Sequence, residues 1–358
     1  MTSTPPPRPS SPGPAACTQP APDSDAHTLP ALDAEVIVVG GGAAGLSAAL
    51  VLGRQQRMVI AIDSGDYRNA PSPGINMLPA ANGIAPKDYV RRGRAALDAV
   101  DTVLRLHDHV TDAQVVRARD EHGAAIDAVE VRVRSGRVIR AARLILATGQ
   151  HDHVSAIDGV AQLWGTKVLH CPYCHGFEAR GGRIVVVHRA DPARPGAGMV
   201  AAYQALYVRQ RLSEHVVFVT DEEPSDEMAA ALTALAVEVI QTRVTAITGD
   251  GDEVTVHAQG HEGIVADHVF FVPESSAGGA GLATSLGLET QGPSILVDDQ
   301  QRTSNPVVFA AGDGAVPRGR PQAMTFVSQA QAQGQLAGLW ADQDLFFAHP
   351  HTPPFPQT

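Results

Sequence analysis

The chain has 358 residues, of which 44% are apolar and 18% are charged, so it is long enough to fold as two domains with buried cores. Its formal net charge of −11 excludes nucleic-acid binding as the main activity, because neutralising phosphates requires a basic surface. The chain holds only three cysteines, Cys17, Cys171 and Cys174, which are too few for a secreted scaffold stapled by disulfides.

Both ends of the chain differ in composition from its middle. Residues 1–32 are rich in Pro, Ser, Thr and Ala and predict a disordered tail, and residues 346–358 predict a second, shorter tail. No basic segment leads into an apolar one near the N-terminus, so we expect no secretory signal. The apolar run at 34–53 contains five glycines and Glu35, which favours a soluble domain over a membrane span. We therefore expect a cytoplasmic protein that binds no membrane.

Between the tails, strand-like apolar runs alternate with Ala-rich helical stretches, which is typical of an α/β fold. A first unit consists of a strand, a glycine-rich loop, a helix and two later strands: Glu35–Val39, Gly40–Gly45, Leu46–Leu52, Met58–Ile62 and Arg143–Ala147. A second unit repeats the strand–helix–strand order, and two further strands follow it: Arg183–Val187, Met199–Arg211, Val216–Thr220, Val269–Val272 and Val307–Ala310.

This order predicts two Rossmann-like dinucleotide-binding domains of the FAD/NAD(P) type, with a three-layer ββα architecture and the second domain inserted in the first. We expect the first domain to comprise residues 33–155 plus 285–345. The inserted domain is expected at 156–284 and would carry Cys171 and Cys174, which form a C-x-x-C pair.

The loop after the first strand has the G-x-G-x-x-G fingerprint, with Gly40, Gly42 and Gly45 as its glycines and Ala43 and Ala44 between them. The first glycine permits the tight turn, and the second lets backbone N–H groups approach a pyrophosphate. The third allows the helix to pack closely on the sheet, while the N-terminus of the helix offsets the phosphate charge. This pattern predicts nucleotide binding.

Three further segments complete the predicted nucleotide site. Asp63 ends the next strand, where a carboxylate can bind ribose hydroxyls. Ala147-Thr148-Gly149 resembles the A-T-G crossover of the flavoprotein reductases with two dinucleotide domains. Gly312-Asp313 follows a late strand and resembles their second FAD motif, whose Asp binds the ribityl and phosphate part of the flavin. Together these motifs predict FAD as the cofactor.

The segment His170-Cys171-Pro172-Tyr173-Cys174-His175-Gly176 contains the most reactive side chains of the chain. If Cys171 caps a short helix, Pro172 falls at the first helical position, and both sulfurs lie on one turn. The N-terminus of the helix favours the thiolate of Cys171. His175 is the nearest side chain with a pKa suited to moving the thiol proton.

A zinc site is the alternative interpretation of the same region. His151, His153, His170 and His175 lie close in sequence to Cys171 and Cys174 and could supply ligands. A single C-x-x-C without a second cysteine pair is weak evidence for zinc, so we expect redox chemistry and no metal.

The order of these motifs resembles the low-molecular-weight thioredoxin reductases from residue 34 to residue 340. The form C-P-Y-C-H-G-F-E is similar to the branch of flavin-dependent dithiol oxidases that close the disulfides of gliotoxin and holomycin. The resemblance implies that Cys174 lies against the flavin and that Cys171 exchanges with the substrate. It also implies a homodimer.

Further flavin contacts are expected from the same resemblance. Asp63-Ser64-Gly65 and Arg68-Asn69 look like the dithiol oxidase branch, and we add Val110 to the predicted cofactor contacts. Gln322-Ala323 matches the pair that lies near the isoalloxazine in the family, although this chain has Pro321 where the family has Arg.

The inserted domain lacks the fingerprint that NADPH binding requires. After its first strand the chain reads His188-Arg189-Ala190-Asp191-Pro192, whose side chains would block a pyrophosphate. Gly196 and Gly198 come too late for the tight turn. The strand that should end in a basic 2′-phosphate site ends in the acidic run at 220–223.

The missing NADPH site, together with the resemblance to the dithiol oxidases, implies an FAD-dependent dithiol oxidase. It would oxidise a small-molecule dithiol to its disulfide through Cys171 and Cys174, with O2 as the electron acceptor and H2O2 as the second product. Two alternatives stay open: a disulfide reductase fed by NADPH, ferredoxin or another donor, and a non-catalytic flavin redox sensor.

Overall fold

The computed structural model describes residues 29–349 and 351–353. Cys17, most of the predicted tail at 1–32 and part of the predicted tail at 346–358 lie outside these residues. The last helix, α8, spans Val327–Ala348 and thus extends into the region predicted as the C-terminal tail. In the part of the chain that the structure describes, no helix is long and apolar enough to span a bilayer.

The first domain is built on a seven-stranded sheet with the order β3-β2-β1-β6-β5-β4, in which β19 also pairs with β6. Strands β1, β2, β3, β6 and β19 pair in parallel, whereas β4, β5 and β6 form an antiparallel meander. The bounds are β1 Ala34–Val39, β2 Val59–Asp63, β3 Val103–His107, β4 Val110–Arg119, β5 Ala125–Val133, β6 Val138–Leu146 and β19 Val308–Ala310.

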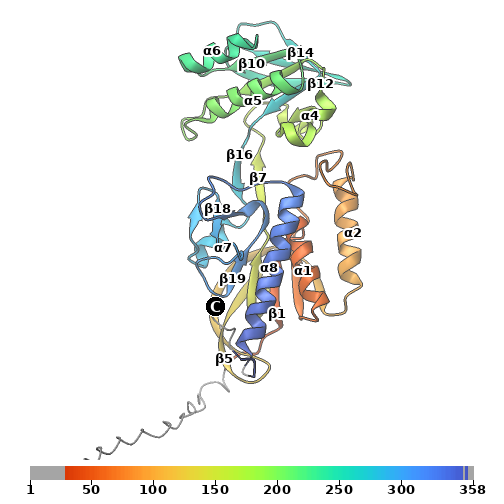
Figure 1. The fold of residues 1–358 in the computed structure, drawn as a ribbon, viewed down its shortest axis with the longest axis vertical. Helices are drawn as coiled ribbons and strands as arrows, with labels where there is room; N and C mark the ends of the chain where they lie inside the picture. Colours follow the sequence, from red (N-terminus) through yellow and green to blue (C-terminus); the bar gives the residue numbers. More distant parts are fainter. Residues whose placement is uncertain (1–28, 350, 354–358) are drawn as a thin grey trace, which may run out of the picture.

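The alternation of β1 places its side chains in two different cores. Val36 and Val38 face helices α1 (Ala43–Arg54) and α8, in a cluster rich in alanine. Ile37 and Val39 face the other side, in a core that they share with side chains of β4, β5 and β6. Figure 1 shows α1, α8 and α2, which spans Pro86–Asp98, gathered on one side of this domain.

The inserted domain has a five-stranded parallel sheet with the order β11-β10-β9-β15-β8. Helices α4, α5 and α6 and the three-stranded sheet β12-β13-β14 accompany it. The bounds are β8 Val168–Leu169, α4 Pro172–Ala179, β9 Ile184–His188, α5 Ala197–Arg211, β10 Val216–Thr220, α6 Asp226–Ala234, β11 Glu238–Gln241, β12 Val244–Asp250, β13 Glu253–Ala258, β14 Ile264–Ala266 and β15 His268–Phe271.

Two antiparallel strands connect the domains: β7 (Gln150–His153) and β16 (Glu274–Ala277) (Figure 1). The fold is therefore the predicted α/β arrangement of two Rossmann-like domains. The remaining elements are α3 Val160–Leu163, α7 Ala280–Ser285, β17 Thr290–Gln291, β18 Ser294–Val297, the 3-10 turn Gly312–Gly314 and β20 Ala315–Pro317.

One packing detail differs from the predicted domain division. We expected residues up to 284 in the inserted domain, but Leu282 and Ala283 of α7 pack in the core of the first domain. The chain has already returned through β16 when α7 begins, so these apolar side chains meet the β4–β5 side of the first sheet.

Candidate active site

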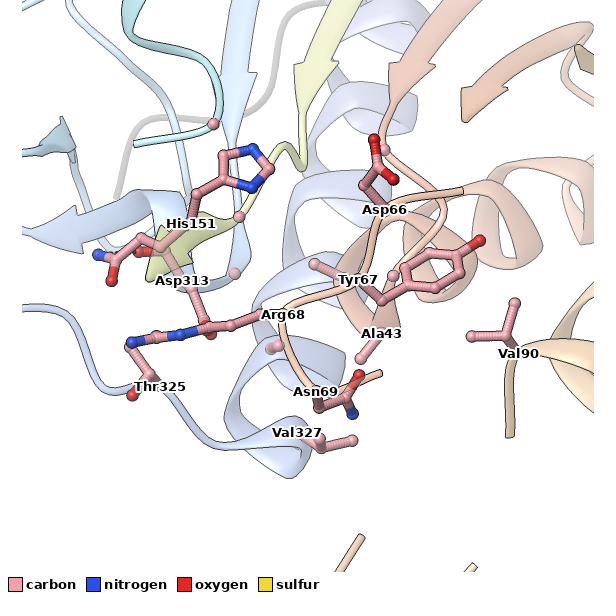
Figure 2. A pocket seen from close by; sticks show the side chains of 18 of the residues that line it. Ala43, Asp66, Tyr67, Arg68, Asn69, Val90, His151, Asp313, Thr325 and Val327 are labelled. Carbon is pink, nitrogen blue, oxygen red and sulfur yellow. Dashed lines mark hydrogen bonds and ion pairs between the residues drawn. The ribbon is translucent and has the colours of Figure 1, made fainter. Parts of the chain in front are cut away.

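A single cavity follows the carboxyl ends of β1, β2 and β6 and extends to the N-terminus of α4. Such an edge is where parallel α/β sheets bind nucleotides. Most predicted site residues line it, and Figure 2 shows several of them converging on the same space. The predicted residues in the lining are Gly40, Gly42, Ala43, Ala44, Asp63, Ser64, Arg68, Asn69, Val110, Thr148, Gly149, Cys171, Cys174, His175, Gly312 and Asp313.

The glycine fingerprint has the geometry of a phosphate cradle. Gly40 has a φ of +108°, and a Cβ there would lie 2.1 Å from the carbonyl oxygen of Ala147. Gly42 is the N-cap residue of α1 and has open space where a Cβ would be. Gly45 does not line the cavity, because its role is packing: a Cβ there would lie 1.7 Å from the carbonyl oxygen of Gly40. The open N-terminus of α1 thus fits a pyrophosphate.

Asp63 is held at the end of β2 by four donors. Its carboxylate accepts backbone N–H bonds from Gly41 at 3.2 Å and Gly65 at 3.1 Å. Arg94 donates to it at 2.8 Å, and the Tyr67 hydroxyl also donates to it. Burial opposes ionisation, but these hydrogen bonds hold the pKa of Asp63 below its usual range. Sequence reasoning missed Tyr67 and Arg94, because neither residue belongs to a motif.

Arg68 links two acidic residues that both line the cavity, Asp152 and Asp313. Its guanidinium donates to Asp152 at 2.7 and 2.9 Å and to Asp313 at 3.0 Å. Asp152 also accepts a hydrogen bond from Ser275 at 2.6 Å. Burial raises the pKa of Asp313, and the Arg68 charge opposes that rise. Figure 2 shows Arg68 reaching across the cavity toward Asp313. Sequence reasoning did not identify Asp152.

Two predicted flavin contacts lie elsewhere. Gln322 is exposed, and neither it nor Ala323 lines the cavity. The lining on this side comes instead from Thr325 and Phe326, just before α8, and from Val327 and Ser328 in its first turn. Within α8, the Gln333 side chain accepts a hydrogen bond from the N–H of Gly312 at 2.8 Å and holds the Gly312-Asp313 turn against the helix.

The two thiols lie at the N-terminus of α4, as the motif predicts. Cys171 is the N-cap residue, and its sulfur accepts the N–H of Cys174 at 3.2 Å. Hydrogen bonding from the Cys174 thiol and from the backbone lowers the pKa of Cys171 to about 7, against the effect of burial. The hydrogen bond to Cys171 and burial raise the pKa of Cys174. Cys171 is therefore the thiol that ionises first.

Helix α4 contacts the first domain through two hydrogen bonds. The Nε2 atom of His175 lies 2.8 Å from the Ser72 hydroxyl, and the Asn76 side chain donates to the Cys174 carbonyl at 2.8 Å. Burial lowers the pKa of His175, so its ring is neutral at physiological pH. Sequence reasoning missed Ser72 and Asn76, which lie in the long loop between β2 and α2.

The corresponding nucleotide position of the inserted domain is filled by its own side chains. The N–H of Ala190, just after β9, donates to the Asp221 carboxylate at 2.5 Å. At the N-terminus of α5, a Cβ on Gly198 would lie 2.5 Å from a carboxylate oxygen of Glu222. Two carboxylates thus occupy the place where a dinucleotide needs free backbone donors.

Among residues 29–349 and 351–353, no group of three or more His, Cys, Asp or Glu side chains is arranged to hold a metal ion.

The cavity therefore combines a nucleotide cradle with a dithiol at its other end, which defines a flavin-dependent thiol oxidoreductase. Residues 34–334 match the family model of the pyridine nucleotide-disulphide oxidoreductases. Thioredoxin reductase tcpT of Claviceps purpurea is 31% identical, over 87% of this chain and 95% of the relative. Thioredoxin reductase sirT of Leptosphaeria maculans is 30% identical, over 79% of this chain and 87% of the relative. The crystal structure of HlmI has 31% identity and a TM-score of 0.76, over 87% of this chain and 92% of HlmI.

The chain belongs to the pyridine nucleotide-disulphide oxidoreductase family and is a thioredoxin reductase-like flavoprotein with FAD as its cofactor. This confirms the predicted enzyme class and cofactor. The cavity residues fit FAD: a Cβ on Gly42 would meet open space, and the Gly312-Asp313 turn, which packs against Ala44 beside the same helix N-terminus, also lines the cavity.

Proposed function

We propose that this enzyme oxidises a small dithiol to its disulfide and uses O2 as the electron acceptor. The observation that carries the proposal is the filled nucleotide position of the inserted domain. Asp221 takes the backbone donor of Ala190, and Glu222 lies against Gly198. An NADPH pyrophosphate would meet carboxylates there instead of backbone N–H groups, so the electrons must come from another donor.

The properties of the two thiols support oxidation of a dithiol. A substrate thiolate attacks the Cys171 sulfur of the enzyme disulfide, the bond between the cysteines breaks, and Cys174 leaves as a thiolate. The second substrate thiolate then attacks the substrate sulfur bound to Cys171, and Cys171 leaves. Because a thiol of lower pKa leaves faster, the lowered pKa of Cys171 favours this second exchange.

His175 is the neutral side chain beside the dithiol that can accept the protons of the substrate thiols. Bound FAD supplies the two-electron acceptor for the reduced Cys171–Cys174 pair, and its reoxidation by O2 yields H2O2. The partly buried positive charge of Arg68 adds to the lowering of the Cys171 pKa and opposes part of the rise in the Cys174 pKa.

Turnover in air tests the proposal. With dithiothreitol as the probe and no NADPH, we expect one H2O2 formed and one cyclic disulfide produced for each dithiol consumed. The Cys171→Ser variant should retain its flavin and form no H2O2. A wild-type enzyme that forms no H2O2 from dithiothreitol, but reduces the cyclic disulfide of dithiothreitol when NADPH is added, would contradict the proposal.

A further inference from the structure

The loop between β2 and α2 belongs to the first domain, yet it lies against the redox helix of the inserted domain. The Ser72 hydroxyl and the His175 Nε2 atom are 2.8 Å apart. Next to this pair, a Cβ on Gly165 would lie 2.9 Å from the backbone of Pro71, so the two domains are in close contact here. The hydrogen bond from Asn76 to the Cys174 carbonyl holds the same helix from the same loop.

The other contacts of Ser72 determine the direction of its hydrogen bond with His175. The Ser72 hydroxyl lies 2.8 Å from the carbonyl oxygen of Gly74, which can only accept. The N–H of Gly74 donates to the Ser72 oxygen at 3.3 Å. A serine hydroxyl has one proton, so a hydroxyl that donates to Gly74 can only accept from the imidazole. His175 then carries its proton on Nε2, and Nδ1 has the free lone pair.

We propose that Ser72 is a positioning residue that holds His175 in the Nε2-protonated tautomer, so that Nδ1 accepts the proton of the substrate thiol. This inference rests on the proposed function. The substrate S–H bond breaks, its electron pair stays on sulfur, and the proton moves to Nδ1. The imidazolium keeps its Nε2–H bond to Ser72, and it later releases the proton to solvent.

The Ser72–His175 hydrogen bond also makes the tautomer of His175 depend on how the two domains are arranged. Ser72 and His175 come from different domains, so the tautomer is fixed only while α4 rests on the β2–α2 loop. Other titratable groups around His175 are Glu178 on α4, the cysteines of the same helix, and His268 on β15. Glu178 is the carboxylate among them, and its charge favours the imidazolium.

The tautomer can be measured directly. In protein labelled with 15N-histidine, long-range 1H–15N correlation spectra distinguish Nε2–H from Nδ1–H, and the His175→Gln variant assigns the signal. The inference requires His175 of the wild-type protein to be protonated on Nε2. A ring protonated on Nδ1 would overturn it, whether or not the enzyme oxidises thiols.

The pH dependence of flavin reduction by dithiothreitol, measured without air, tests the role in the reaction. Loss of the Ser72 hydroxyl, which accepts the hydrogen bond from Nε2–H, should destabilise the His175 imidazolium. Ser72→Ala should therefore lower the limiting rate about three- to tenfold and move the acidic limb of the profile down by about 0.5 to 1 pH unit. Ser72→Thr keeps a hydroxyl and should restore both. The matched control is Thr248→Ala, which removes an equally short hydroxyl–imidazole contact to His257, outside the cavity, and should change neither.

Two outcomes of the Ser72→Ala measurement would overturn the inference. An acidic limb that moves up in Ser72→Ala would show that Ser72 donates to the ring. An unchanged profile would show that the contact does not act on the proton acceptor. Failure of the wild-type enzyme to react with dithiothreitol would instead count against the proposed function, and the tautomer measurement would still decide the position of the proton.

Discussion

Arg68 and Asp152 form a two-point ion pair, with N–O distances of 2.7 and 2.9 Å, at the point where the chain leaves the first domain. Only 17% of the Arg68 side chain and 7% of the Asp152 side chain are exposed, so solvent screens the pair weakly. Because Asp152 lies on β7 and Arg68 also contacts Asp313, one guanidinium connects the interdomain strands to the flavin site.

Removal of this guanidinium should destabilise the protein more than removal of an exposed one. Arg68→Met leaves the carboxylates of Asp152 and Asp313 without their partner, which we expect to cost about 3–5 kcal/mol. Arg91→Met breaks only the exposed pair with Asp88 and should cost at most about 1 kcal/mol. Melting temperatures of the two variants check this, and equal values would contradict the buried role of Arg68.

Substitutions of two fingerprint glycines should have different effects: Gly42→Ala should weaken FAD binding, and Gly45→Ala should impair folding. Gly42 has a φ of −76° and open space where a Cβ would be, so Gly42→Ala should fold normally. Its methyl group would, however, enter the pyrophosphate cradle, and we expect FAD affinity to fall about tenfold or more. Gly45→Ala should lower the yield of folded protein, because its Cβ collides with the Gly40 carbonyl. The readouts are flavin content and melting temperature. A Gly42→Ala protein with normal FAD affinity would argue against the cradle.

Because Cys171 and Cys174 have different roles, their single serine variants should form mixed disulfides with a thiol reagent at different rates. Cys174→Ser leaves Cys171 able to exchange but unable to resolve, so 5,5′-dithiobis(2-nitrobenzoate) should leave a stable aryl adduct on Cys171. In Cys171→Ser, the Cys174 thiol loses the hydrogen bond to Cys171, but desolvation still raises its pKa, so Cys174 should react slowly. Mass spectrometry on a Cys17→Ser background identifies the modified residue. Faster labelling of Cys174 would reverse the assignment.

The reactivity of Cys171 should depend on pH near neutrality. Its pKa is lowered to about 7, so in the reduced enzyme its thiolate forms as pH rises through that value. An ordinary cysteine ionises near pH 8.5. Iodoacetamide labelling of the Cys171 peptide should therefore rise between about pH 6 and 8 and then level off. A rate that is still rising above pH 9 would show that the hydrogen bonds to Cys171 do not stabilise its thiolate.

Local sequence patterns were sufficient to predict the parts of the fold that depend only on residues close together in the sequence. The strand at β1, the following glycine loop and Cys171 as an N-cap depend on neighbours in sequence, and the structure has all three. The antiparallel β4–β5 meander was not predicted, because its alternation of exposed and buried residues contains no motif.

The contacts that shape the cavity depend on long-range folding. Asp152 meets Arg68 across 84 residues, and Ser72 meets His175 across 103 residues. Sequence spacing does not predict pairs of residues that lie so far apart in the chain. Gln322 and Ala323 were predicted from a family match at a position where this chain has Pro321, and the start of α8 supplies the lining instead.

The central claim is that electrons enter the flavin from a dithiol and not from NADPH. The most direct test is an anaerobic titration of the purified holoenzyme that follows the visible flavin band. We predict no bleaching with excess NADPH, followed by full bleaching with dithiothreitol and return of the band, with H2O2, when air is admitted. Rapid bleaching by NADPH would contradict the account, because it would require a dinucleotide site where Asp221 and Glu222 now lie.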